Sequence, residues 1–416
     1  MARTRKWPIL SPSSPATRQA TAPAAIMPST AAFWRREGAG AMIDTEPQLA
    51  AMLEARKARR ALPPYIPQAD ADVAALLASF FARELPGSSV SGIARIGGGA
   101  SKEQFVFTLA APGEDPRRYV LRMDALEGIT ETSRAREYEI LKAFAGVVPV
   151  PDPVWLDAEA AHFPTPAVIM EFVPGVTKPQ TDGVSVTGLG TVLGDPLRGL
   201  IAPQYYDNLA RIHNFDWTKA GLTQFTAPTA DPKQATRWLI NFWKELLEQD
   251  AVTREPVLRL ATQWLEDHVP DCEAPCVVHG DYRTGNYLFD EASGRITAIL
   301  DWEMSYIGDF HADLGWLLQP VFGSCIDGVF RVSDIAPRDE WIAAYEAASG
   351  NRVDPVKLHY FTVFNAWKSY ILVSALGMQA ARTAHNHQDV LLTFLAATGP
   401  MFVDDLARLL MMEESR

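Results

Sequence analysis

The sequence predicts an α+β fold with two lobes, in which a small lobe of β-sheet plus one helix precedes a larger, mostly helical lobe. The length of 416 residues is ample for a large core and favours more than one lobe. From about residue 86 to 173 the patterns run strand, glycine turn, strand, strand, helix and strand, whereas helical spacing dominates residues 174–416. The content of 48% hydrophobic and 21% charged residues is typical of a globular protein.

Residues 1–42 stand apart from the rest of the chain. They are basic, rich in Pro, Ala, Ser and Thr, and lack an unbroken apolar core of signal-peptide length. We therefore expect a disordered basic tail. A transit-like sequence is one alternative, and an over-extended start with Met27 or Met42 as the true initiator is another.

A helical lead-in follows at residues 43–85, ahead of the small lobe. Two patterns with helical spacing, at 46–60 and 70–84, support it. In the second, Val73, Leu77 and neighbouring apolar residues share one face. We expect this lead-in to pack on the first lobe.

Charge and cysteine content restrict the partners and the location. A net charge of −12 argues against a nucleic-acid backbone as partner, because such binding depends on Lys and Arg neutralising phosphates. Three cysteines are too few for a disulfide framework, so a reducing cytoplasm is the expected location. No later segment looks long and uncharged enough to span a membrane, so we expect no membrane partner. The oligomeric state stays open.

The glycine turn of the small lobe has the composition of an anion-binding loop. Its glycines, including Gly98 and Gly99, let backbone amides approach an anion closely, and the Ser101 hydroxyl is a further donor. An ordinary hairpin turn is the alternative. The turn has no strict G-x-G-x-x-G pattern, and the chain contains no G-x4-G-K-[ST], which excludes a Walker-type site.

The helix expected at 131–145 follows the third strand of this lobe and carries two acids that differ in their expected burial. Arg122 lies in the strand, and the helix offers Glu137 and Glu139 as partners. The apolar residues of the helix define one face, with Glu137 in its middle and Glu139 nearly opposite. An acid on a buried face needs a cation, so we expect Glu137 to pair with Arg122 and Glu139 to be solvated. An outward-facing Arg122 is the alternative.

Hard oxygen donors converge in the stretch from Cys276 to Asp309. A carboxylate at Asp281 and an amide at Asn286 precede two short apolar strands joined by a turn, and a second carboxylate follows at Asp301. Phosphoryl transfer needs such a set: one carboxylate to orient and deprotonate a hydroxyl, and further oxygens to hold magnesium. The alternative is a polar turn between two core strands.

The phrase His279-Gly-Asp281-x4-Asn286, followed by Leu300-Asp301-Trp-Glu303, resembles the aminoglycoside phosphotransferase family, the antibiotic-kinase branch of the protein-kinase-like fold. The resemblance implies that Asp281 is the catalytic base and that Asn286 and Asp301 are the magnesium ligands. Arg283 stands where related kinases place a cation near the transferred phosphate. Asp313 would brace the catalytic loop, and His213 reads as a packed structural histidine.

The resemblance also implies a nucleotide site between the lobes. Gly98, Gly99 and Ser101 would cover the phosphates. Arg122 stands where kinases carry the lysine that pairs the α- and β-phosphates; relatives resembling acyl-CoA-dehydrogenase-linked phosphotransferases also have Arg there, and Arg can grip a phosphate with two parallel hydrogen bonds. The strand at 167–173 resembles the interlobe hinge, and its implied adenine-site residues are Met170, Glu171 and Val173. An ordinary core strand is the alternative.

In the larger lobe we expect a long loop at 176–200 and helices at 204–214, around 238–246, at 338–348 and at 355–383. These helices are rich in aromatic residues. The family places its acceptor pocket among such helices, and their apolar side chains favour a hydroxylated acceptor with hydrophobic surface.

Together these patterns predict a phosphotransferase that moves the γ-phosphate of ATP, with GTP as the alternative nucleotide, to a hydroxyl of a small molecule in the presence of Mg²⁺. A catalytically inactive nucleotide-binding module is one rival. A two-metal hydrolase is another, and its metal ligands would come from His279, Asp281, Asp301, Asp309, His311 and Asp313.

Overall fold

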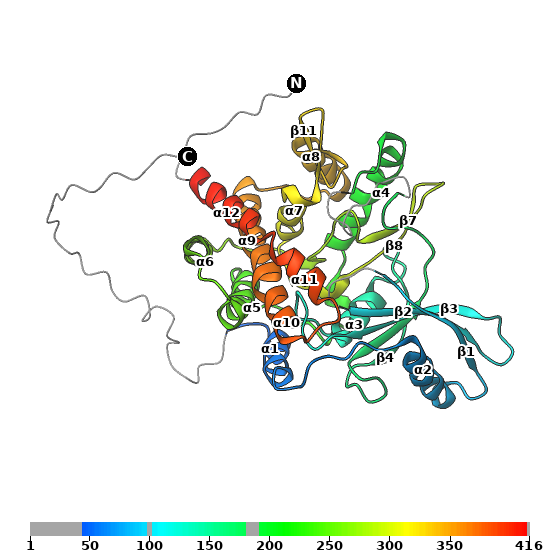
Figure 1. The fold of residues 1–416 in the computed structure, drawn as a ribbon. Coiled ribbons are helices and arrows are strands. Elements are labelled where there is room, and N and C mark those ends of the chain that lie inside the picture. Colours follow the sequence, from blue (N-terminus) through cyan, green and yellow to red (C-terminus); the bar gives the residue numbers. More distant parts are fainter. Residues whose placement is uncertain (1–43, 98–101, 180–190, 414–416) are drawn as a thin grey trace, which may run out of the picture. The chain divides into compact units, whose positions relative to one another are not determined.

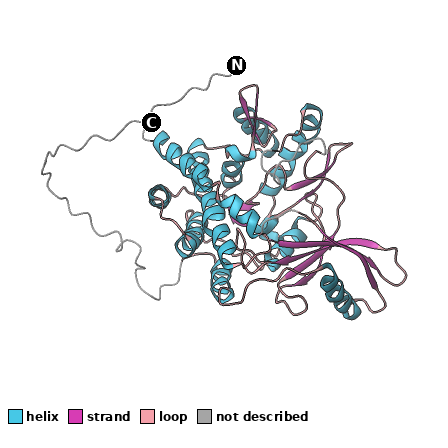
Figure 2. Cartoon of the chain, viewed as in Figure 1, coloured by secondary structure: helices cyan, strands magenta, loops and turns pink. Residues whose placement is uncertain are grey.

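The computed structural model describes residues 44–97, 102–179 and 191–413. The predicted tail at 1–42 and the predicted phosphate-loop residues Gly98, Gly99 and Ser101 lie outside the described residues. The largest sheet lies in one part of the described chain, and helices with a few short strands make up the rest (Figure 2). The predicted α+β class is therefore confirmed.

The small lobe is a five-stranded antiparallel sheet with the strand order β1-β2-β3-β5-β4. Its elements are β1 (Ser89–Arg95), β2 (Lys102–Ala110), β3 (Arg117–Asp124), α3 (Arg134–Phe144), β4 (Pro153–Asp157) and β5 (Ala167–Glu171). Phe105, Phe107 and Leu109 of β2 are buried and alternate with less buried residues, because successive side chains of a strand face opposite sides. These side chains pack with Leu77 and Phe81 of α2 (Asp70–Glu84). The helix α2 therefore covers one face of the sheet.

The two predicted lead-in helices are confirmed, but they pack on different lobes. The helix α1 (Pro47–Arg59) buries Leu49 and Leu53 in the core of the larger lobe, among residues of α5 (Gln234–Asp250). Figure 1 shows α1 beside α5 and α2 beside the sheet. The expectation that the whole lead-in packs on the first lobe is thus right for α2 and wrong for α1.

Charged side chains fix α1 in place. Arg56 is fully buried and forms ion pairs with Glu131, with Asp250 of α5 and, at 3.4 Å, with Glu127. Glu127 also accepts a hydrogen bond from His385 near the C-terminus. A fully buried charge is costly unless it is paired and hydrogen-bonded, and these acids supply the partners. One arginine of α1 thereby joins the segment after β3 to the larger lobe.

Helices build most of the larger lobe. They are α4 (Asp195–His213), α5, α6 (Pro256–Asp267), α7 (His311–Leu317), α8 (Arg338–Ser349), α9 (Pro355–Tyr370), α10 (Met378–Thr383), α11 (Asp389–Ala396) and α12 (Gly399–Glu413), with a π-helical segment at Ile371–Gly377 and short 3-10 turns at Trp217–Lys219, Trp302–Met304 and Pro320–Phe322. The short strands are β6 (Cys276–Val278), β7 (Tyr287–Asp290), β8 (Arg295–Ile299), β9 (Tyr306–Gly308), β10 (Ser324–Ile326), β11 (Val329–Val332) and β12 (Ala336–Pro337).

Three features of this lobe differ from the sequence-based expectations. The helix α4 begins nine residues before the expected start at 204, so the described end of the expected loop is helical. The helix expected at 355–383 is interrupted by π-helical geometry at Ile371–Gly377. The stretch Asp389–Met412 has the length and apolar composition of a membrane span, contrary to expectation, although a turn at 397–398 divides it into α11 and α12.

Candidate active site

Two pairs of short strands hold the stretch that the sequence singles out. Antiparallel pairing of β6 with β9 brings the start of the catalytic loop, residues 279–286, beside the segment that follows Asp301. In the hairpin of β7 and β8, Tyr287 pairs with Ile299, and the amide of Leu300 donates to the carbonyl of Asn286 at 2.8 Å. Asn286 and Asp301 therefore lie at the same end of the hairpin, as the predicted order of strands requires.

The Asp281 carboxylate is held by three donors. Its Oδ1 accepts from the Trp316 Nε1–H at 2.8 Å and from the Arg283 Nε–H at 2.9 Å, and its Oδ2 accepts from the Asn286 amide at 2.6 Å. Donors to both oxygens fix the orientation of the carboxylate. Arg283, expected near the transferred phosphate, binds the carboxylate of Asp281. Trp316 of α7 was not identified from the sequence.

Asp313 and His213 hold the start of the catalytic loop in place. The two oxygens of Asp313 accept from the amides of His279 and Gly280, each at 2.8 Å, and His213 lies 3.1 Å from the same carboxylate. Burial opposes ionisation of Asp313, but the bond from His213 and the His279 amide hold its pKa below the ordinary value. His213 also contacts the Tyr345 hydroxyl at 2.7 Å. Both expected structural roles agree with this packing.

Gly280 leaves no room for a side chain in this loop. Its φ is +84°, in the left-handed region, and a Cβ there would lie 2.4 Å from the carbonyl oxygen of Met304. The loop can therefore approach the segment after Asp301 this closely only with glycine at the position.

The expected Arg122–Glu137 pair is present, and it extends to Asp301. Arg122 binds Glu137 Oε1 through Nη1 at 2.6 Å and Asp301 Oδ1 through Nη2 at 2.8 Å. Burial raises the pKa of Asp301 and the Arg122 guanidinium lowers it, with a net value below the ordinary one. Asp301 itself has left-handed backbone angles, φ 62° and ψ 52°. One arginine of β3 thus links α3 to the second carboxylate of the site.

Further charges surround this pair, and the sequence reasoning missed them. Arg134 shares the Glu137 carboxylate with Arg122 and binds Glu303 at 3.0 Å. Lys102 of β2 lies 3.1 Å from Asp124, and that carboxylate lies 3.0 Å from Arg134. Burial raises the pKa of Glu303, although the nearby cations oppose it. The only sequence signal was the density of charges within otherwise apolar strands and at the start of α3.

Glu139 is not a solvated helix charge. It is half-buried, and its carboxylate accepts from the amides of Thr223 and Gln224 at 2.6 and 2.8 Å and from the Thr223 hydroxyl at 2.7 Å. The expectation of free solvation is wrong, because the loop that covers this face of α3 comes from a segment 84 residues away.

The comparison with protein families agrees with this geometry. The family model described as "Phosphotransferase enzyme family" matches residues 92–359. The chain belongs to this family. The match includes the catalytic loop, Arg122, Glu137 and Asp301, and it excludes α1 and all of the chain beyond residue 359.

Solved structures show the same fold for this phosphotransferase. A candidate aminoglycoside phosphotransferase from Ralstonia eutropha JMP134 is 21% identical, with a TM-score of 0.59, and the alignment covers 80% of this chain and 97% of that one. An aminoglycoside phosphotransferase solved with GDP and kanamycin aligns with a TM-score of 0.50 at 17% identity, covering 80% and 98% of the two chains. The predicted bilobal, protein-kinase-like fold is confirmed.

Curated relatives of the phosphotransferase are longer proteins. "Acyl-CoA dehydrogenase family member 10" of Mus musculus is 31% identical over 206 residues, which are 48% of this chain and 18% of that protein. "Acyl-CoA dehydrogenase family member 11" of Gallus gallus is 27% identical over 194 residues, 45% and 23% of the two proteins. The chain spans about a fifth of the length of these relatives.

The strand expected to form the hinge of this phosphotransferase is β5. Met170 is buried, the amide of Glu171 donates to the Asp152 carbonyl at 2.9 Å, and the amide of Phe172 donates to the Arg118 carbonyl at 3.0 Å. These two amides are therefore engaged within the fold. The assignment of the adenine site stays a prediction.

The donor set suits a magnesium ion held with phosphates better than a two-metal hydrolase centre. The Asn286 amide nitrogen faces Asp281, which leaves its oxygen for a cation beside the Asp301 carboxylate. Magnesium is commonly bound by a few protein oxygens together with substrate phosphates. In the part of the chain that the structure describes, no three His, Cys, Asp or Glu side chains gather as a metal site. Asp309 and His311 bind each other, and Asp313 binds the catalytic loop, so they are engaged elsewhere.

Proposed function

We propose that this chain is a magnesium-dependent phosphotransferase that moves the γ-phosphate of ATP to a hydroxyl group of a small molecule. The observation that carries the proposal is the placement of an oriented carboxylate, Asp281, directly against Asn286 at the end of the hairpin that bears Asp301. Transfer of a phosphoryl group depends mainly on positioning and on electrostatic stabilisation, and this arrangement supplies both. GTP is the alternative nucleotide, because one structural neighbour was solved with GDP.

Asp281 can accept the acceptor's proton at one particular oxygen. Each carboxylate oxygen offers about two acceptor sites. Trp316 and Arg283 occupy those of Oδ1, whereas Asn286 is the one donor to Oδ2 among the residues that the structure describes. We therefore place the acceptor hydroxyl at Oδ2, where Asp281 orients it and takes its proton as the bond to phosphorus forms.

Arg122, Asn286 and Asp301 would serve the nucleotide. Asn286 and Asp301 would hold Mg²⁺, which supplies neutralisation of the charge on the phosphate oxygens when bound. Arg122 is kept charged, because Glu137 and Asp301 outweigh the effect of burial and raise its pKa. In the nucleotide complex we expect Arg122 to keep its bond to Glu137 and to turn its second edge from Asp301 towards the phosphates.

The acceptor is proposed as a hydroxylated molecule with apolar surface, from the aromatic side chains of α5 and α9. A panel for the search should hold kanamycin, which one structural neighbour binds, and hydroxylated acyl compounds, because the curated relatives are named acyl-CoA dehydrogenases. We also propose a cytoplasmic location, since all three cysteines are free.

Calorimetry and a turnover assay test the proposal. We expect Mg²⁺-dependent binding of ATP and consumption of ATP with at least one member of the panel. Asp281→Asn keeps the size of the side chain but cannot accept a proton, so turnover should fall by about 10²–10⁴-fold while ATP affinity stays nearly unchanged. Asp301→Asn should weaken both metal–nucleotide binding and turnover.

The two alternative functions predict different results in these assays. Tight metal binding without nucleotide binding would support a hydrolase. Nucleotide binding without transfer to any acceptor would support an inactive binding module. Full activity of Asp281→Asn would show that the hydroxyl is activated elsewhere.

A further inference from the structure

A buried lysine lies directly beneath the catalytic loop. Lys368 of α9 is 3% exposed, and its Nζ donates to the carbonyl of Gly280 at 3.1 Å. The same Nζ lies 3.9 Å from the centre of the Trp316 ring. Among the residues that the structure describes, no carboxylate forms an ion pair with it. A buried ammonium without an ion-pair partner is rare, because burial penalises the charge.

The contacts of Lys368 with Gly280 and Trp316 lead to Asp281. Gly280 precedes Asp281 in the chain, and its amide and carbonyl are held from two sides, by Asp313 and by Lys368. Trp316 carries the ammonium on its ring face and donates its indole N–H to Asp281 Oδ1. A cation over an indole ring is a favourable contact, worth more when water is excluded. The position of Lys368 therefore bears on the backbone before the carboxylate and on one of its three donors.

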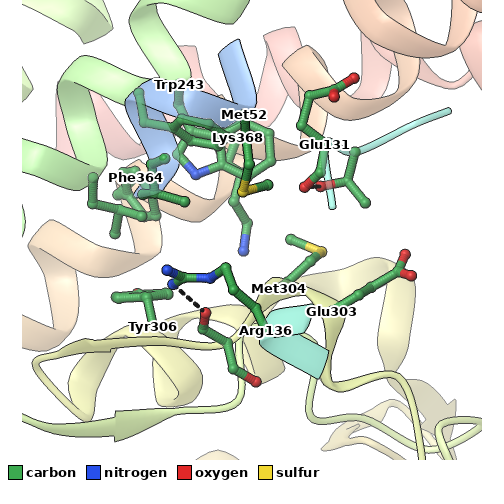
Figure 3. A pocket seen from close by; sticks show the side chains of 14 residues that line it. Met52, Glu131, Arg136, Trp243, Glu303, Met304, Tyr306, Phe364 and Lys368 are labelled. Carbon is green, nitrogen blue, oxygen red and sulfur yellow. Dashed lines mark hydrogen bonds between the residues drawn. The ribbon is translucent and has the colours of Figure 1, made fainter. Parts of the chain in front are cut away.

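The ammonium points into a small cavity rather than to solvent. The cavity measures about 30 Å³, room for one or two water molecules, and Figure 3 shows the Lys368 side chain directed into it between Trp243 and Met304. Its other labelled walls are Met52, Tyr306, Phe364, Glu131, Glu303 and Arg136. This volume is too small for an acceptor molecule, so the lysine does not serve there as a substrate ligand.

The charges around the ammonium act in opposite directions. Burial lowers the pKa of Lys368 to about 7, and Asp281 and Asp313 on the catalytic-loop side act to raise it. Glu131 and Glu303 face the cavity from the segments after β3 and β8, and Arg136 faces it from α3. Because the ammonium is more stable in the unfolded chain than in the fold, a contribution to the free energy of unfolding does not explain why Lys368 is buried.

We propose that Lys368 is a positioning residue for phosphoryl transfer, which fixes the catalytic loop through the Gly280 carbonyl and the Trp316 ring so that Asp281 keeps its orientation. The inference rests on the proposed function, since it takes Asp281 as the base. Lys368 lies beyond residue 359 and so outside the segment that the family model matches. The charged form performs the role, because only the ammonium gains from the ring face of Trp316.

The test compares Lys368→Met with the wild-type protein from pH 5.5 to 9. Methionine has a similar length and no charge. We expect kcat to fall by about 10–100-fold below pH 7, since small displacements at a reacting group are costly, and the KM for ATP to change little. As the wild-type ammonium loses its proton above pH 7, the ratio of wild-type to variant kcat should decrease. The ratio cancels any titration of ATP itself.

Lys244→Met is the matched control. Lys244 lies on α5 beside Trp243, is partly exposed and pairs with Glu266, so the wild-type kcat and pH profile should persist. Wild-type turnover is measured first; its absence overturns the proposed function and this inference together. With turnover present, a Lys368→Met variant that matches the wild type, or a kcat ratio independent of pH, overturns only the role of Lys368. If Lys368→Met does not fold, the wild type decides: a kcat profile without a decline near pH 7 overturns the role.

Discussion

Replacement of Lys368 by Met should make the folded protein more stable at pH 6, although it slows the reaction. The pKa of lysine is 10.5 in an unfolded chain, and burial lowers that of Lys368 to about 7. At about 1.36 kcal/mol for each pKa unit, keeping the ammonium in the fold costs on the order of 5 kcal/mol below pH 7. The variant leaves the Gly280 carbonyl without its donor, which costs about 1–3 kcal/mol. The net gain expected at pH 6 is about 2–4 kcal/mol.

The stability that Lys368→Met gains over the wild type should decrease as the pH rises, which would identify the lysine charge as its cause. Between pH 7 and 10.5 the unfolded chain holds a proton on this lysine that the folded protein has released. Wild-type stability therefore rises with pH in this window, while Lys368→Met lacks that dependence. From pH 6 to pH 9 the advantage of the variant should shrink by about 3 kcal/mol.

Urea unfolding of both proteins at several pH values, followed by tryptophan fluorescence, measures this difference. Lys244→Met serves again as the control, and its difference from the wild type should stay small and independent of pH. The reasoning is refuted if Lys368→Met is less stable than the wild type at pH 6. A difference that stays constant from pH 6 to pH 9 refutes it as well, because the cost would then not arise from the charge.

Glu137→Gln should weaken Mg-ATP binding by about tenfold, because Arg122 loses a charged partner. Glu139→Gln should instead lower the free energy of unfolding and change ATP affinity less than twofold. Equal losses of ATP affinity in calorimetry would contradict this difference. Gly280→Ala should lower the free energy of unfolding by at least about 1–3 kcal/mol and remove most of the turnover, because the new Cβ would clash with the Met304 carbonyl. A fully active Gly280→Ala variant would show that the loop has room to shift. Asp313→Asn should be about 2–4 kcal/mol less stable than the wild type at pH 7. Because the pKa of Asp313 is lowered in the folded protein, the unfolded wild-type chain gains this proton first as the pH falls below 3.8, so the deficit of the variant should shrink there, as acid titration of unfolding would show.

Local patterns predicted the elements that carry the site. The apolar runs around the turn at 291–294 became β7 and β8, and the helical face argument placed Glu137 inward, where it is 1% exposed. Both signals are carried by neighbours in the chain, so the sequence contains them in full. The roles assigned to Asp281, Asn286 and Asp301 stay predictions until the variants are measured.

What escaped prediction depends on segments far apart in the chain. The start of α4 was expected to be a loop because the run up to residue 200 is rich in glycine and weakly charged, yet Arg198 of this helix binds Asp334 at 3.1 Å. The partner of Glu139 lies 84 residues away, and Lys368 approaches a carbonyl 88 residues before it. Such contacts override local propensity, and no spacing rule within a single sequence specifies them.

The burial of Arg56 sets a limit on how far the protein can be trimmed. A fragment cut at the borders of the family match, residues 92–359, would lose this arginine while Glu127, Glu131 and Asp250 remained in the interior. Removing one partner of a buried ion pair typically costs about 3–5 kcal/mol, a large part of the stability of a whole domain. We therefore expect a fragment that starts at residue 92 to be less stable than one that keeps α1.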